Sequence, residues 1–137
     1  MIVVDASVLT DFLLGRPAAV GAIEAELAGR EHEPLHAPEL IEPETLNALR
    51  RLMRRGDVTL ERAGQAVTDL ASARLIRYSH APLRPRVWAL RDALTAYDAS
   101  YLALAEALND ALLLTGDSGL AKVARRSLGA GAVRHVS

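Results

Sequence analysis

Short apolar runs alternate with longer stretches of helical pattern along the whole chain, and this alternation is what most constrains its fold. The runs that indicate strands lie at 2–4, 35–37, 75–78, 111–115 and 133–136. Helical spacing fills the stretches between them, at about 7–14, 18–28, 38–55, 59–73, 82–94, 95–108 and 118–127. Strands that are joined through helices pair in parallel. The sequence therefore predicts an α/β sandwich with several helices around a small sheet.

Composition is that of one folded domain, which we expect to span 1–137. The chain has 137 residues, of which 50% are hydrophobic and 24% are charged. It contains no cysteine, so any metal must be held by oxygen or imidazole ligands. No basic segment precedes the first apolar run, and no stretch approaches 18 uninterrupted apolar residues. These features predict a soluble cytoplasmic protein with no membrane contact.

Charge is segregated along the chain although the net charge is only -1. Seven acids and one arginine lie between Glu24 and Glu44, and four arginines follow them closely: Arg50, Arg51, Arg54 and Arg55. Such blocks form either solvated helix faces or a rim that holds phosphates around an acidic centre. The sequence leaves both interpretations open.

Four acids stand where functional groups gather in a parallel sheet. Asp5 directly follows the first strand and Asp117 follows the strand at 111–115, whereas Glu44 and Asp98 each lie in the first turn of a helix. Ligands of open α/β sheets bind beyond the carboxyl ends of the strands, where the next helices begin. We therefore expect the four carboxylates to lie close together.

Each acid also has an ordinary explanation as a helix cap. Asp5 or Ser7 is placed to cap the first helix, with Ser7 the better candidate, and Asp117 is placed to cap the last. Capping does not explain why several acids gather at one end, where their repulsion costs stability unless a cation neutralises it. An all-oxygen set without histidine or cysteine suits Mg²⁺, with Mn²⁺ able to substitute. We expect the four scattered histidines to have structural roles or to lie at the surface.

Four segments carry a resemblance to a known family: VVDASVL, PETLNAL, TAYDASYLALAEAL and LLLTGDSGLA. In this order and spacing they resemble the PIN-domain ribonucleases, specifically the VapC-type toxins of bacterial type II toxin-antitoxin pairs. The resemblance spans nearly the whole chain. It implies a PIN-like three-layer α/β/α sandwich with a short, mostly parallel sheet of four or five strands. It further implies a metal-dependent endoribonuclease, in which a metal-activated water hydrolyses RNA.

The resemblance also assigns roles to individual residues. Asp5 and Asp98 correspond to metal-binding aspartates. The expected catalytic set is Asp5, Glu44, Asp98 and Asp117, and the expected substrate-contacting or supporting set is Ser7, Asn47 and Thr115. Glu44 stands three residues before Asn47, as the family pattern requires, although Glu42 lies close enough to be the alternative.

The implied partners are RNA, a cognate VapB-type antitoxin that holds the enzyme inactive, and a second copy of the chain in a homodimer. DNA would be contacted only indirectly, through the antitoxin. The alternative from another functional class is a catalytically silent PIN-like binding module, in which the acids survive as caps and the protein acts through a partner. Metal-dependent RNA cleavage distinguishes the two.

Overall fold

A five-stranded, all-parallel sheet forms the centre of the molecule in the computed structural model, which describes all 137 residues. The strands are β1 (Ile2–Val4), β2 (Leu35–Pro38), β3 (Leu75–Tyr78), β4 (Leu112–Thr115) and β5 (Val133–His135). Their order across the sheet is β3-β2-β1-β4-β5. The chain thus starts in the middle, builds towards one edge, returns to the middle and builds towards the other.

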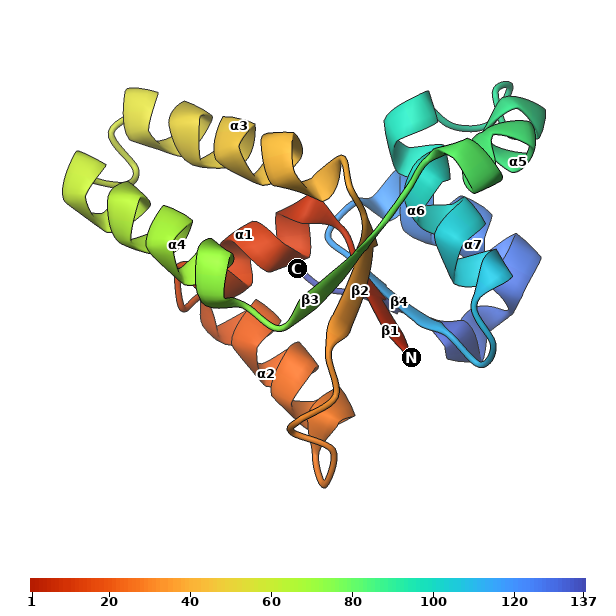
Figure 1. Cartoon of the computed structure of the whole chain (residues 1–137), viewed down its shortest axis with the longest axis horizontal. Coiled ribbons are helices and arrows are strands. Elements are labelled where there is room, and N and C mark those ends of the chain that lie inside the picture. The colour runs from red at the N-terminus through yellow and green to blue at the C-terminus, as the bar shows by residue number, and fades with distance from the viewer.

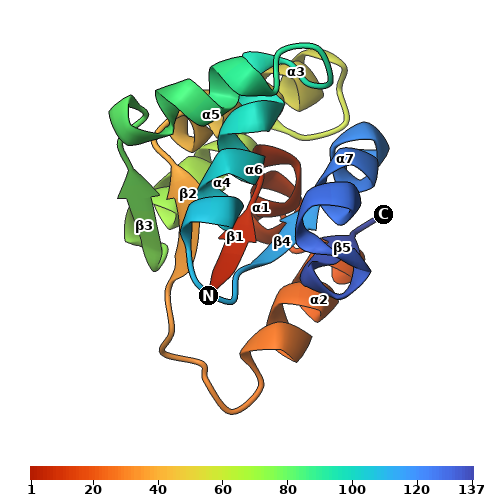
Figure 2. The same ribbon diagram turned by 90° about the vertical axis from the view of Figure 1, so that its right-hand side faces the viewer.

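Helices cover both faces of this sheet (Figures 1 and 2). On one face lie α1 (Ala6–Leu13), α2 (Pro17–Leu27), α3 (Ile41–Arg54) and α4 (Leu60–Ser72), and on the other lie α5 (Arg84–Ala89), α6 (Ala96–Ala107) and α7 (Ser118–Leu128). The change of face follows from the strand order, because right-handed crossovers place their helices on opposite faces when the direction of building reverses. The expected three-layer α/β/α architecture is confirmed.

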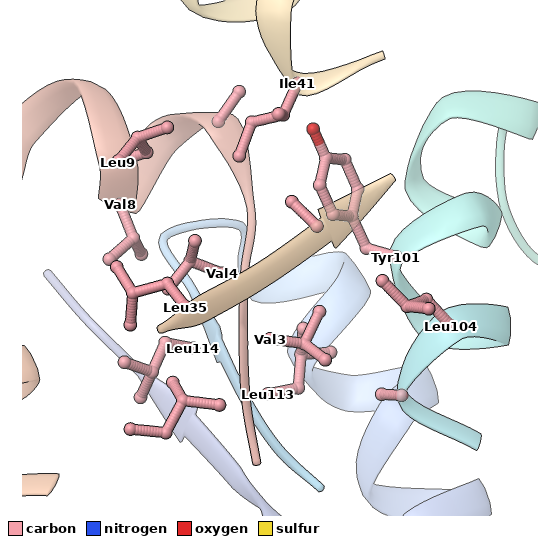
Figure 3. Close-up of a cluster of buried hydrophobic side chains, with 14 of the residues drawn as sticks. Val3, Val4, Val8, Leu9, Leu35, Ile41, Tyr101, Leu104, Leu113 and Leu114 are labelled. Carbon is pink, nitrogen blue, oxygen red and sulfur yellow. The ribbon is translucent and has the colours of Figure 1, made fainter. Parts of the chain in front are cut away.

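The core is centred on the two middle strands. Val3, Val4, Leu113 and Leu114 are fully buried, since helices pack on both sides of β1 and β4. Figure 3 shows Val3 and Leu113 on the side of Leu104 of α6, and Val4 and Leu114 on the opposite side, towards α1. Continuous apolar runs rather than alternating ones are typical of strands that are buried on both faces. This burial on both faces explains why the apolar runs clearly indicated strands although the strands are short.

Two boundaries differ from expectation. Pro38 does not open a helix: it is the last residue of β2, where it pairs with Tyr78, and α3 begins only at Ile41. The single helix expected over 82–94 is instead a 3-10 turn at Ala81–Leu83 followed by the six-residue α5. Pro82 and Pro85 lie in the first turns of the 3-10 segment and of α5, where a missing backbone N–H is tolerated, so they mark two helix starts in place of one. The other expected elements are confirmed to within two residues.

No single helix is long and apolar enough to cross a membrane. The pair formed by α1 and α2 satisfies length and composition only when the two are taken together, and they are bent by 103° to each other.

The packing of β4 gives a prediction about stability. Leu113→Ala should lower the free energy of unfolding by about 3 kcal/mol, because it leaves a cavity between closely packed layers. Urea denaturation followed by circular dichroism measures the change. Leu60→Ala is the matched control: Leu60 is 74% exposed, so its loss should cost roughly 0.5 kcal/mol or less. Equal losses in the two variants would contradict this description of the core.

Candidate active site at the carboxyl end of the sheet

One pocket of about 390 Å³ lies where the strand order reverses, beyond the carboxyl ends of β1 and β4. Its lining includes all four of the acids singled out in the sequence: Asp5, Glu44, Asp98 and Asp117. They come from four different segments, namely the residues after β1 and β4 and the first turns of α3 and α6. The parallel sheet thus brings together carboxylates that are up to 112 residues apart (117 − 5) in the sequence.

Asp5 is the most buried of the four acids, with 5% of its surface exposed. Its Oδ1 accepts hydrogen bonds from the Ser7 hydroxyl at 2.6 Å and from the Val8 backbone N–H at 3.0 Å, and its Oδ2 accepts one from the Thr115 hydroxyl. Burial raises the pKa of Asp5, while these donors partly oppose the rise. The donors hold both carboxylate oxygens in fixed directions.

The cap of α1 differs from expectation, because Asp5 and not Ser7 occupies the capping position. Ser7 lies inside the first turn of the helix, where its hydroxyl donates to Asp5 and accepts a hydrogen bond of 3.0 Å from the Gly116 backbone N–H. A Cβ at Gly116 would lie 2.7 Å from the Ser7 hydroxyl oxygen. The close approach of these two segments therefore requires glycine at position 116.

Glu44 is positioned by a residue from the opposite helical layer. The Tyr101 hydroxyl of α6 donates a 2.6 Å hydrogen bond to Glu44 Oε1, and Figure 3 shows the tyrosine oxygen directed towards the start of α3. Partial burial and the nearby charge of Asp5 raise the pKa of Glu44, whereas the tyrosine and Arg51 lower it. Glu42, the alternative considered from the sequence, points elsewhere: it pairs with Arg77 of β3 and does not line the pocket.

The acidity of Asp98 is altered by its burial and by the other three acids of the site. Burial, followed by the charges of Asp117, Asp5 and Glu44, raises the pKa of Asp98 to about 6. Its backbone N–H is capped by the Thr95 hydroxyl at 3.2 Å, which leaves its carboxylate among the pocket-lining groups. Such a shift arises where a carboxyl is partly buried and other carboxylates face the same space.

Asp117 serves as the cap of α7 while it lines the pocket. Its Oδ1 accepts the Leu120 backbone N–H at 2.8 Å, and its own N–H donates to the Thr115 hydroxyl at 3.0 Å. Thr115, which is fully buried, thus touches both aspartates that follow the central strands. Among the three expected supporting residues, Ser7 and Asn47 line the pocket, and Thr115 lies behind Asp5.

The donor set of the pocket fits a hard divalent cation. The structure contains no three acidic or histidine side chains that are already arranged as metal ligands. The four acids that line the pocket nevertheless offer carboxylate oxygens, the ligands that Mg²⁺ prefers. The hydrogen bonds to Asp5 hold both of its carboxylate oxygens in place beside the pocket, where a cation can bind them.

The pocket also contains residues that sequence reasoning did not place there, namely Thr10, Asp11, Arg16 and Tyr101. Tyr101 stands three residues after Asp98, so helix periodicity could have placed both on one face. Arg16, which precedes α2, carried no comparable signal. None of the four histidines lines the pocket; His36 instead contacts the Tyr78 hydroxyl at 2.7 Å.

Comparisons with known proteins identify the family of this chain. The PIN domain family model matches residues 2–126. Ribonuclease VapC9 of Mycobacterium tuberculosis is 41% identical over 113 residues, which cover 82% of this chain and 84% of that protein. Ribonuclease VapC1 of the same species is 42% identical over 121 residues, covering 87% of each, and its ribonuclease VapC3 is 35% identical over 121 residues, covering 88% and 85%. The chain belongs to the PIN-domain family and, within it, to the VapC ribonucleases.

Proposed function

We propose that this protein is a Mg²⁺-dependent endoribonuclease that acts as the toxin of a toxin-antitoxin pair, hydrolysing RNA phosphodiester bonds with water as the nucleophile. One observation carries the proposal. Four carboxylates from separate segments line one pocket, and their combined charge and burial raise the pKa of Asp98 to about 6. Helix capping alone would leave these charges without compensation, whereas a divalent cation compensates for them.

Asp5 and Asp98 are the residues that would hold the cation directly, with Glu44 and Asp117 completing the site through waters or at a second metal position. A bound Mg²⁺ would supply an acidified water and would stabilise negative charge on the phosphate. Glutamate and aspartate side chains without histidine favour Mg²⁺ or Mn²⁺ over zinc.

The surrounding residues keep these carboxylates in place. Ser7, Thr115 and the Val8 N–H fix both oxygens of Asp5, so that this carboxylate needs little reorganisation when a ligand binds. Tyr101 fixes Glu44 in the same way. Asn47 lies one turn beyond Glu44 on the wall of the pocket, where its amide can donate to a substrate phosphate or sugar oxygen.

An antitoxin of the VapB type and a second copy of the chain are the protein partners that we propose. Exposed apolar side chains are available on one helical hairpin, where Leu46 of α3 is 43% exposed and Leu60 and Val67 of α4 are 74% and 43% exposed. Leu60 and Val67 are two helical turns apart and therefore lie on one face of α4. We expect the complex to act in the cytoplasm, where its RNA substrate is found, and to contact DNA only through the antitoxin.

Asp98→Asn should abolish RNA cleavage while the fold is retained, because it removes a proposed cation ligand without a change in shape. Incubation of the purified protein with RNA and Mg²⁺, followed by mapping of the RNA ends, measures the rate and the site of cleavage. EDTA should stop cleavage by the wild type. Asp92→Asn, an exposed carboxylate outside the pocket, is the matched control and should retain full activity. Cleavage by Asp98→Asn at the wild-type rate would contradict the proposal, and no cleavage by any variant would favour the silent binding module.

The acidity of Asp98 gives a second prediction, for the protein without divalent ions. The folded-state pKa of about 6 lies above the reference value of 3.8, so the folded state binds the proton more tightly and its stability falls as the pH rises through this window. The Asp98→Asn variant carries no ionisable group at this position, so its stability does not fall in this way. Its melting temperature should therefore match the wild type near pH 4 and exceed it by about 3 °C near pH 7.5, once solvent screening is allowed for.

Calorimetry at the two pH values, with and without Mg²⁺, provides the measurement. Mg²⁺ should raise the melting temperature of the wild type at the higher pH and leave that of Asp98→Asn nearly unchanged. A variant that is less stable than the wild type at the higher pH without metal would be inconsistent with a repelled carboxylate.

Tyr101→Phe should reduce cleavage about tenfold, because Glu44 loses the hydrogen bond that fixes its direction. The same change should lower the free energy of unfolding by about 1–2 kcal/mol, since a half-buried carboxylate loses a donor. Tyr97→Phe lies on the same helix and is the control, because Tyr97 is 65% exposed. If both tyrosine variants cleave RNA equally fast, Tyr101 does not position Glu44.

A further inference from the structure

The face of α3 that lines the pocket changes from acidic to basic along the helix. Its pocket-lining residues are Glu44, Asn47, Ala48, Arg51, Leu52 and Arg55, the last of which directly follows the helix. Successive members stand one or three positions apart in the sequence, so they form a stripe along one side. The pocket therefore extends from the carboxylate cluster along this stripe to a cationic end.

The arginines on this stripe are available to a ligand. Arg51 is exposed and takes part in none of the six ion pairs of the structure. Arg55 has one partner, Asp57 at 3.6 Å, and both side chains are more than half exposed. A surface pair of this kind contributes little stability, so a phosphate can replace the carboxylate at small cost.

The other two arginines of this helix provide the contrast. Arg50 and Arg54 are exposed and belong to the same charged segment, yet neither lines the pocket. Each precedes a stripe residue by one position, which turns its side chain about 100° around the helix axis. The four arginines thus divide into two that face the pocket and two that face solvent.

The cationic end of the pocket offsets the repulsion between the four carboxylates and a negatively charged ligand. Four acids around the pocket repel a polyanion, and the repulsion weakens only where cations neutralise it. From the helical rise, Arg51 lies about 10 Å and Arg55 about 16 Å beyond Glu44 along the axis. These lengths match phosphates that are a few nucleotides away from the scissile bond.

We propose that Arg51 and Arg55 bind backbone phosphates of the RNA strand to one side of the scissile bond, and that Arg50 and Arg54 make no such contacts. The proposal deepens the nuclease function described above and rests on it. These contacts are sequence-independent, because phosphates carry no base information. They determine how the strand lies in the pocket rather than which base is cleaved.

Two double variants of equal charge test this assignment: Arg51→Gln with Arg55→Gln, and Arg50→Gln with Arg54→Gln. Glutamine keeps a long, helix-compatible side chain, so both proteins should fold, as circular dichroism will verify. The probe is a fluorescein-labelled single-stranded RNA of mixed sequence. Its anisotropy gives the dissociation constant at several KCl concentrations, and EDTA is present throughout to prevent cleavage.

The double variant of the pocket-facing arginines, Arg51→Gln with Arg55→Gln, should bind RNA about tenfold more weakly. Its slope of log affinity against log salt should be smaller by about 1.4, since each lost contact with a single strand removes about 0.7. The solvent-facing pair should change the slope by less than half as much. Equal effects of the two double variants would show general attraction by net charge and would overturn the proposal. So would an unchanged slope in the pocket-facing pair, which is the result expected if these arginines serve a protein partner instead.

Because binding is measured without cleavage, the two proposals fail separately. A wild type that binds RNA with the expected slopes but does not cleave it with Mg²⁺ overturns the nuclease function and supports the phosphate contacts as a binding site. A wild type that cleaves RNA while both double variants bind it alike overturns the phosphate contacts alone.

Discussion

The parallel pairing of β1 with β4 is the constraint on which the site depends. It aligns Val4 with Leu114, so that the two strands end at the same edge and the residues after them meet. Thr115 donates to Asp5 across this junction and accepts the N–H of Asp117. The helices on the two faces then supply Glu44 and Asp98 from their first turns. A single sheet pairing thus organises carboxylates from four segments.

Helix capping and ligand binding are combined in this protein rather than being alternatives. Asp5 caps α1 and Asp117 caps α7 through one carboxylate oxygen each, while both residues line the pocket. At Asp5 the capping bond stabilises the ionised form of a carboxyl that burial disfavours. A cap therefore helps a buried carboxylate to remain available to a cation. Helix capping, the ordinary explanation for these acids, is thus correct for Asp5 and Asp117. It is compatible with a role of the same residues in binding a cation.

The sequence predicted most of the fold because its strands are continuous apolar runs and its helices end at recognisable residues. Gly15 and Gly56, with φ of +73° and +79°, follow α1 and α3 in the left-handed conformation that glycine favours. Prediction was wrong at Pro38 and over 82–94, where proline permits either a helix start or an extended segment and tertiary packing decides. Of the two candidates for the cap of α1, the less favoured Asp5 proved correct, since the choice between it and Ser7 depends on backbone geometry.

The surroundings of the four acids were harder to predict than the acids themselves. Asp5, Glu44, Asp98 and Asp117 follow strands or begin helices, and the sheet topology alone indicates where such positions meet. Helix periodicity places Tyr101 on the face of Asp98, but its contact with Glu44 depends on how the two helical layers pack, which no local pattern encodes. Arg16 lines the pocket without any comparable signal in the sequence. The stripe on α3 also limits where residues can be inserted in this protein. Because a helix fixes both spacing and rotation, one inserted residue between Ala48 and Arg51 would turn everything after it by about 100°. The spacing of residues within this part of α3 must therefore be kept if Arg51 and Arg55 are to face the pocket.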